Sequence, residues 1–239
     1  MFQDAKDSYP AIYNSSEELF KITDNESIVE IIKFLEPWSF LGTGDDIKGA
    51  VYEIFLKSTL RGDFDQYFTP REIVDYMVKF SDPNIGDKIL DPACGSGGFL
   101  IYALEYVWDK MGKDRKYKNS PDFEDVKKKV AEKYFFGIDK EMDLVKIAKA
   151  YMAIAGDGRG GIVQQNTLHT PDEFDGKAKE LLVKDEKFIK FDIILTNPPF
   201  GSKIKVLKSD AEYFELGHIH KLNTKTNTFH KTEKAKDTE

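Results

Sequence analysis

Short apolar runs alternate with longer amphipathic segments through the middle of the chain. The apolar runs predict four strands, at residues 88–90, 134–138, 162–164 and 191–196. Segments with helical periodicity lie before or between these strands, at residues 70–78, 98–108 and 141–155. Strands that alternate with helices predict an α/β fold in which helices cover both faces of a parallel sheet.

The segments around this core are predicted to be of three kinds. Residues 1–60 are expected to be the end of a helical N-terminal region, with one helix near 28–35 and another that runs to Leu60. Residues 61–200 are expected to hold the α/β core, and 201–239 to form a loop and tail after it. The charged insertion at 109–133 is expected to be peripheral, and the polar last twenty residues to be loose.

Composition indicates a globular protein of a reducing compartment. The chain has 239 residues, 41% of them hydrophobic, and a single cysteine, Cys94. One cysteine excludes an internal disulfide. The first ten residues contain Asp4, Lys6 and Asp7, where a signal peptide needs an apolar core, and no apolar run approaches membrane-spanning length. We therefore expect a cytoplasmic protein with no membrane partner.

The chain carries a formal net charge of −7, whereas a protein that binds nucleic acid normally presents a basic face. Local lysine clusters at 127–129 and through the tail from Lys203 to Lys236 leave two interpretations open. They either form a basic lip or are solvated side chains.

A glycine-rich turn follows the first predicted strand. It spans Asp91 to Phe99 and reads Asp-Pro-Ala-Cys-Gly-Ser-Gly-Gly-Phe. Glycines let the backbone approach a ligand, and the helix that follows offers free N–H groups. A dinucleotide fingerprint needs Gly or Ala where this chain has Leu100, and a phosphate-binding P-loop needs a lysine that is absent. No histidine lies near Cys94 in the sequence, so we interpret it as a small buried residue and not as a nucleophile.

Polar residues also follow the second and third predicted strands. Asp139 comes directly after the second strand, where a carboxylate can bind both hydroxyls of a ribose, or can cap the next helix. Asn166 follows the third strand, where it can meet the edge of a bound adenine or form an ordinary Asx turn. These strand ends predict a nucleoside-containing cofactor.

The fourth predicted strand ends in Asn197, Pro198, Pro199 and Phe200. The amino group of a base is a poor nucleophile, because its lone pair is delocalised into the ring. The side-chain oxygen of Asn197 and the stiffly held carbonyl of Pro198 can each accept one N–H and so direct that lone pair. Phe200 would stack on a base flipped out of the duplex. The alternative is a rigid turn without chemistry.

These motifs resemble the gamma-ordered DNA adenine-N6 methyltransferases, and in particular the modification subunit of type I restriction–modification systems. The resemblance implies a Rossmann-like fold that binds S-adenosylmethionine and methylates a flipped adenine in double-stranded DNA. Asn197, Pro198, Pro199 and Phe200 correspond to the target-adenine motif. The cofactor residues that it implies are Gln66, Tyr67, Phe68, Thr69, Pro70, Arg71, Asp91, Ala93, Gly95, Ser96, Gly97, Gly98, Asp139 and Asn166. No metal is implied.

The implied partners are a specificity subunit, a second modification subunit and, in the full complex, a restriction subunit. The family continues well past the length of this chain, so we interpret residues 61–200 as a partial catalytic core with a sheet incomplete on its C-terminal side. Two other functions stay open. One is methylation of RNA adenine or of a protein glutamine, and the other is a non-catalytic fragment that binds only the cofactor or a partner subunit.

Overall fold

The computed structural model describes residues 7, 12, 22–37, 69–155, 159–199, 206–214 and 217–235. The predicted helix that runs to Leu60 and the candidate site residues 66–68 and 200 lie outside these ranges. The predicted N-terminal helix near 28–35 is present as α2 (Asn25–Leu35), which the side chain of Asp24 caps through the Glu26 and Ser27 N–H groups.

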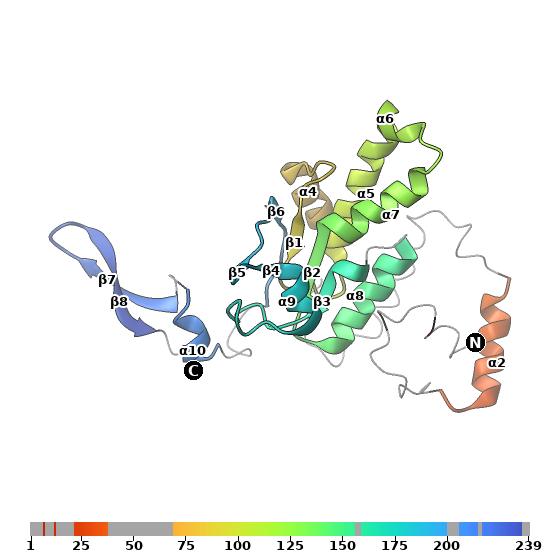
Figure 1. The fold of residues 1–239 in the computed structure, drawn as a ribbon. Helices are drawn as coiled ribbons and strands as arrows, with labels where there is room; N and C mark the ends of the chain where they lie inside the picture. The colour runs from red at the N-terminus through yellow and green to blue at the C-terminus, as the bar shows by residue number, and fades with distance from the viewer. Residues whose placement is uncertain are drawn as a thin grey trace.

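A four-stranded parallel sheet forms the centre of the molecule (Figure 1). Its strands are β1 (Ile89–Asp91), β2 (Phe135–Asp139), β3 (Ile162–Gln164) and β6 (Ile193–Ile194). They lie in the order β3-β2-β1-β6, and Leu90 of β1 pairs with Phe136 on one side and Ile194 on the other. The parallel α/β architecture predicted from the sequence is confirmed.

Alternate residues of the strands face two separate hydrophobic cores, as expected for a sheet covered on both faces. Ile89, Phe135 and Ile162 face the larger core. That core is covered by α4 (Arg71–Ser81), α5 (Gly98–Lys113), α7 (Phe123–Tyr134) and α8 (Met142–Ala155). Leu90, Phe136 and Val163 face the smaller core, which α9 (Gly176–Leu182) covers.

The charged insertion is less peripheral than the sequence suggested. Helix α5 continues to Lys113, a short α6 (Arg115–Lys118) follows, and α7 returns to the sheet. Met111, Val130 and Ala131 are buried in the larger core. The prediction failed here because the many lysines of α7 hide its narrow apolar stripe in the sequence. A few apolar residues are nevertheless enough to pack one face of a helix against the core.

Three other local expectations need correction. Helical periodicity over 70–78 puts the apolar Ile73, Val74 and Val78 on one face, but 48% of Ile73 is exposed, while Val74 and Val78 are buried. The fourth strand is predicted over 191–196, but β6 has two residues, and Ile194 is 59% exposed at the sheet edge. The last residues are not loose throughout, since β7 (His218–Asn223) and β8 (Thr228–Ala235) form an antiparallel hairpin.

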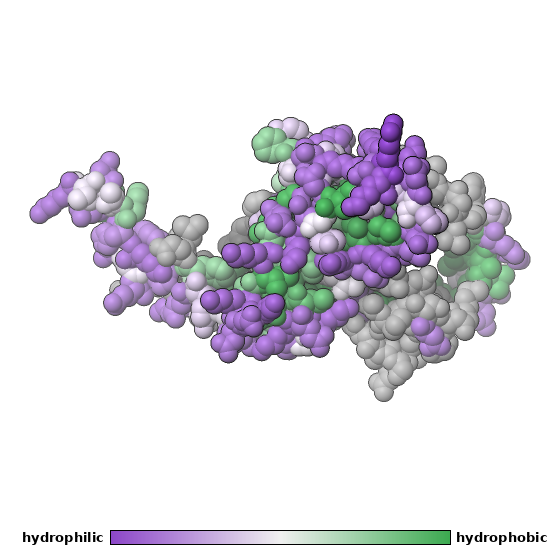
Figure 2. Space-filling model, turned by 45° about the horizontal axis from the view of Figure 1, so that its top comes forward, coloured by the Kyte–Doolittle hydropathy of each residue, from purple (hydrophilic) through white to green (hydrophobic). Residues whose placement is uncertain are grey.

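The remaining elements are short: η1 (Arg159–Gly161), the paired strands β4 (Val183–Lys184) and β5 (Lys187–Phe188), and α10 (Lys208–Ala211). On the face that Figure 2 shows, hydrophobic surface gathers near the centre with hydrophilic surface around it, and the hairpin is mostly hydrophilic. Within the described ranges, no helix has the length and apolar character needed to cross a membrane.

Candidate functional site

The glycine-rich turn lies at the carboxyl end of β1 and is hydrogen-bonded to β2. The Cys94 N–H donates to the Ile138 carbonyl at 2.9 Å, and the Gly97 N–H donates to the Cys94 carbonyl at 2.7 Å. Gly95 and Gly97 have φ angles of 51° and 89°, a left-handed conformation that glycine adopts without strain. Gly97 is also the N-cap of α5, so the turn ends at the start of that helix.

Asp139 holds the turn from the end of β2. One carboxylate oxygen accepts the Gly95 N–H at 2.9 Å, and the other accepts the Glu141 N–H at 2.9 Å, just before α8. Asp139 therefore caps the start of α8 with one oxygen and holds the glycine-rich turn with the other. A carboxylate has about four acceptor positions, so these two bonds leave capacity for ligand hydroxyls.

Two acids at neighbouring strand ends have raised pKa values. Burial raises the pKa of Asp91 to about 7, and the nearby Asp139 adds to this rise, while Thr196 and the Ala93 N–H oppose it. Burial likewise raises the pKa of Asp139. In the described part of the chain, neither carboxyl has a basic side chain as a salt-bridge partner. A bound cation would favour the charged form of both carboxyls, so the site suits a cationic, hydroxyl-bearing ligand.

The turn after β3 packs against the same place. The Asn166 side-chain oxygen accepts the Leu168 N–H at 3.1 Å, which is the Asx turn that the sequence offered as an alternative. The Thr167 hydroxyl donates to the Pro92 carbonyl in the glycine-rich turn. The ends of β1, β2 and β3 are thus joined by hydrogen bonds into one edge.

Asn197 lies just beyond β6, the other neighbour of β1. Its amide nitrogen donates to the Thr69 hydroxyl at 2.9 Å, which links two segments 128 residues apart in the chain. The Leu195 N–H donates to the Leu90 carbonyl at 3.0 Å, so β1 sets the position of the approach to Asn197. Pro198 and Pro199 are exposed beyond it.

Most of the other predicted residues fall in the same region or hold it in place. Ser96 is buried within the glycine-rich turn, and Gly98 begins α5. Pro70 is the N-cap of α4, and its carbonyl accepts the Ile73 and Val74 N–H groups. The Arg71 guanidinium donates to the Tyr102 hydroxyl and lies 5.6 Å from the centre of its ring.

Cys94 is unsuited to nucleophilic chemistry. It is buried, and burial raises the pKa of its thiol well above the usual value. A protonated, enclosed thiol is a weak nucleophile. Among the described residues, no group of three or more His, Cys, Asp or Glu side chains could hold a metal ion.

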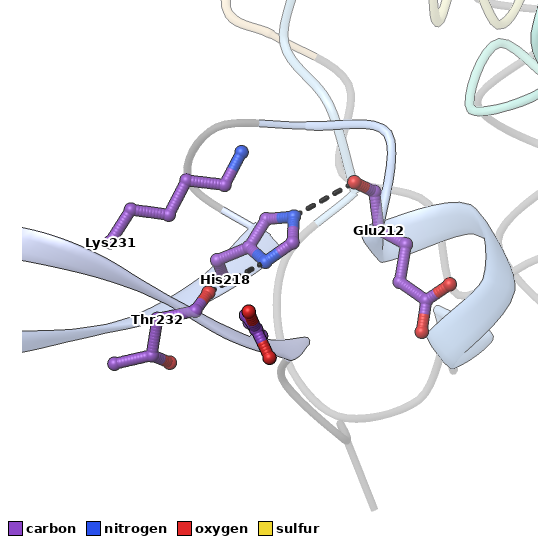
Figure 3. Close-up of a pocket in the computed structure, with 5 residues that line it drawn as sticks. Glu212, His218, Lys231 and Thr232 are labelled. Atoms are coloured by element: carbon purple, nitrogen blue, oxygen red, sulfur yellow. Dashed lines mark hydrogen bonds between the residues drawn. The ribbon is translucent and has the colours of Figure 1, made fainter.

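A separate pocket lies at the base of the C-terminal hairpin and is lined by residues from the turn after α10 and from β7 and β8 (Figure 3). The two ring nitrogens of the buried His218 lie 2.8 Å from the Glu212 carbonyl oxygen and 3.1 Å from the Thr232 carbonyl oxygen. His218 therefore joins the hairpin to this turn, which is a structural role.

Sequence reasoning missed two contributors to the site, the bond from Thr167 to the glycine-rich turn and the bond from Asn197 to Thr69. A hydroxyl directly after Asn166 was a weak signal for the first. The second had no local signal, because its partners are far apart in sequence.

The chain is similar to several known proteins. The family model described as N-6 DNA Methylase matches residues 43–235. The methylase subunit of the type I restriction enzyme EcoEI from Escherichia coli is 32% identical over 155 residues, which cover 64% of this chain and 27% of that protein. The chain spans about a quarter or less of the length of the first curated relatives that it matches.

Two solved structures show the same fold. One, from work on assembly of the type I restriction–modification system, has a TM-score of 0.54 and 24% identity, and covers 83% of this chain and 37% of that chain. The other is a Listeria monocytogenes protein solved as a candidate class I S-adenosylmethionine-dependent methyltransferase. It has a TM-score of 0.52 and 18% identity, and covers 82% of this chain and 51% of that chain. The fold is the Rossmann-like methyltransferase fold.

Proposed function

This chain belongs to the N-6 DNA methylase family, and we propose that it transfers a methyl group from S-adenosylmethionine to the N6 amino group of adenine in double-stranded DNA. We place it in the modification subunit of a type I restriction–modification complex, working in the cytoplasm. Its relatives include type I methylase subunits. Its partners would be a specificity subunit, a second modification subunit and a restriction subunit.

One observation carries this proposal. The glycine-rich turn follows β1, Asp139 ends β2, and Asn197 follows β6. The candidate site for the methyl donor and the candidate site for the base therefore lie at the carboxyl ends of β1 and of the two strands that pair with it. In an open parallel sheet, ligands bind beyond the carboxyl ends of the strands. A methyl donor held at the first site and a base held at the second would meet there.

The donor side of the site fits S-adenosylmethionine in its chemistry. That cofactor carries a sulfonium, an ammonium and two ribose hydroxyls, and it supplies the methyl group when bound. Asp91 and Asp139 are acidic groups without a described basic partner, and burial raises the pKa of both. We assign the ribose hydroxyls to Asp139 and the cationic methionine part to Asp91, the glycine-rich turn and the backbone of the segment from Gln66 to Arg71.

The acceptor side would activate the target nitrogen through hydrogen bonds. As this nitrogen bonds to the methyl carbon, the carbon–sulfur bond would break, S-adenosylhomocysteine would leave, and the proton that the nitrogen then loses would pass to solvent. The Asn197 side-chain oxygen and the Pro198 carbonyl accept the two N–H groups of the adenine amino group. This draws the nitrogen toward tetrahedral geometry and directs its lone pair at the methyl donor. Proline fixes φ and so holds the carbonyl stiffly. Phe200 stacks on the flipped base.

The test is the substitution Asn197→Ala in the full-length protein assembled with its partner subunits. We expect nearly complete loss of labelled methyl transfer to adenine in duplex DNA. The affinity for S-adenosylmethionine, measured by calorimetry, should stay close to that of the wild type, because Asn197 is assigned to the base. Asn119→Ala, on the surface after α6, is the matched control.

Near-normal methyl transfer by Asn197→Ala would disprove the assigned role of Asn197. The wild-type assay also separates the other functions left open by the sequence. Label recovered in RNA adenine or in a glutamine side chain, and not in DNA, would favour those substrates. Cofactor binding with no transfer to any of the three would favour a non-catalytic role.

A further inference from the structure

The contact between Thr69 and Asn197 joins two segments that are each fixed by the core. Thr69 comes just before Pro70, the N-cap of α4, whose residues Val74 and Val78 are buried in the larger hydrophobic core. Asn197 comes three residues after β6, which pairs with β1. The 2.9 Å hydrogen bond from the Asn197 amide nitrogen to the Thr69 hydroxyl therefore joins the segment before α4 to the segment after β6.

The direction of this bond matters because the two ends of an amide differ. The nitrogen only donates hydrogen bonds, and the oxygen only accepts them. An adenine amino group has two N–H groups to donate, so only the oxygen of Asn197 can help it. With the nitrogen turned toward Thr69, the oxygen is the end left for the base, and among the described residues nothing donates to it.

We propose that Thr69 is a positioning residue for methyl transfer, whose hydroxyl fixes the Asn197 amide with its oxygen toward the target amino group. This inference rests on the role of Asn197 in the proposed function. It differs from the cofactor contact that the family resemblance implies for Thr69, because here the hydroxyl serves the target side of the site. Thr69 acts through Asn197 and does not itself touch the reacting atoms.

Three variants of the full-length protein in its complex test the proposal. Thr69→Val keeps the shape of the side chain and removes the acceptor, and we expect kcat to fall about 10- to 100-fold, as for a misplaced catalytic group. The affinity for S-adenosylmethionine and the KM for DNA should stay near their wild-type values. Thr69→Ser keeps the hydroxyl and should restore most of kcat.

The third variant, Thr170→Val, is the matched control. The Thr170 hydroxyl donates to the Glu173 carboxylate at 2.8 Å and has no role in the proposed site. Its kcat should equal that of the wild type. Unfolding temperatures of all three variants separate a loss of fold from a loss of positioning. If Thr69→Val does not fold, the same measurements are made on Thr69→Ala, which also removes the hydroxyl.

A double-mutant cycle gives the decisive result. If Thr69 acts through Asn197, then Thr69→Val should cause no further loss of the residual activity of Asn197→Ala. The proposal would be overturned if the two substitutions reduced activity independently in the double variant. It would also be overturned if Thr69→Val weakened S-adenosylmethionine binding and left kcat unchanged. If Asn197→Ala is inactive but Thr69→Val is fully active, only this inference fails. If Asn197→Ala is fully active, the proposed role of Asn197 fails and this inference with it.

Discussion

Several residues of the proposed site are acids and amides whose side chains are held by hydrogen bonds. Asp139 accepts the Gly95 and Glu141 N–H groups, and Asn166 accepts the Leu168 N–H. Such bonds fix the direction of a side chain before any ligand arrives. At this scale each residue has a structural role beside its proposed functional role, and substitution of single residues separates the two.

Asp139→Ala is expected to weaken S-adenosylmethionine binding by about 1.5–3 kcal/mol, the contribution of hydrogen bonds to a charged group. Calorimetry on the full-length protein measures the change. Asp143→Ala, on the exposed first turn of α8, is the matched control and should bind as the wild type does. If Asp139→Ala binds with unchanged affinity, Asp139 is only a structural cap.

The raised pKa of Asp91 predicts that stability depends on pH. The folded chain keeps the Asp91 proton up to about pH 7, because its pKa is raised to about 7 from the ordinary aspartate value of 3.8. The folded state therefore binds more protons between these values, and the unfolding free energy should fall as the pH rises from about 4 to about 7 and then level off.

Urea unfolding across this pH range measures the slope, which for one proton approaches about 1.4 kcal/mol per pH unit. Asp91→Asn should remove most of it, and Asp122→Asn, on the surface, should leave it unchanged. If the pH dependence persists in Asp91→Asn, it arises from other groups, including Asp139, whose pKa is also raised.

The elements position these residues through close packing between β2 and α5. A Cβ atom on Gly137 of β2 would lie 2.8 Å from Leu100 Cδ1 and 3.1 Å from Cys94 Sγ. The sheet and the first helix approach so closely only because this position has no side chain. Gly137 therefore sets the spacing between β2 and the glycine-rich turn.

Gly137→Ala is expected to lower the unfolding free energy by about 1–3 kcal/mol, the usual cost of overpacking. Gly112→Ala provides the control, because nothing lies within 4 Å of a Cβ at that position in α5. It should be neutral or stabilise the chain by up to about 1 kcal/mol through helix propensity. Denaturant unfolding compares both variants, and equal effects would exclude the close packing as the cause.

The molecule as a whole has an open sheet edge in its described part. Strand β6 pairs with β1 alone, and Ile194 is 59% exposed. An exposed apolar edge offers unpaired backbone groups to another chain. We therefore expect the isolated 239-residue chain to be marginally stable, to self-associate and to lack methyl transfer to DNA, while weak cofactor binding survives.

Light scattering tests this expectation. Ile194→Lys should reduce self-association, because a charge on an edge strand opposes pairing. Phe80→Lys replaces a side chain that is 80% exposed on helix α4 and not on a strand, and should have less effect. A monodisperse wild-type chain with methyltransferase activity would show that the open edge is harmless and that the described core is sufficient.

The parallel α/β fold, the order of the four strands along the chain and the motifs at their ends could all be predicted from the amino-acid sequence. These features have local causes. Apolar runs predict strands, glycines permit a tight turn, and a polar residue after a strand marks the edge where ligands bind. Membership of the family is likewise visible in short motifs, such as Asp91 to Phe99 and Asn197 to Phe200.

Which segments meet in space became visible only in the folded chain. The neighbours of β1, the burial of Val130 and Ala131, and the bond between Asn197 and Thr69 each join residues distant in sequence. No local pattern specifies such contacts, because they arise when several elements bury apolar surface together. The raised pKa of Asp91 has the same origin, since burial is a property of the packed fold and not of the residue.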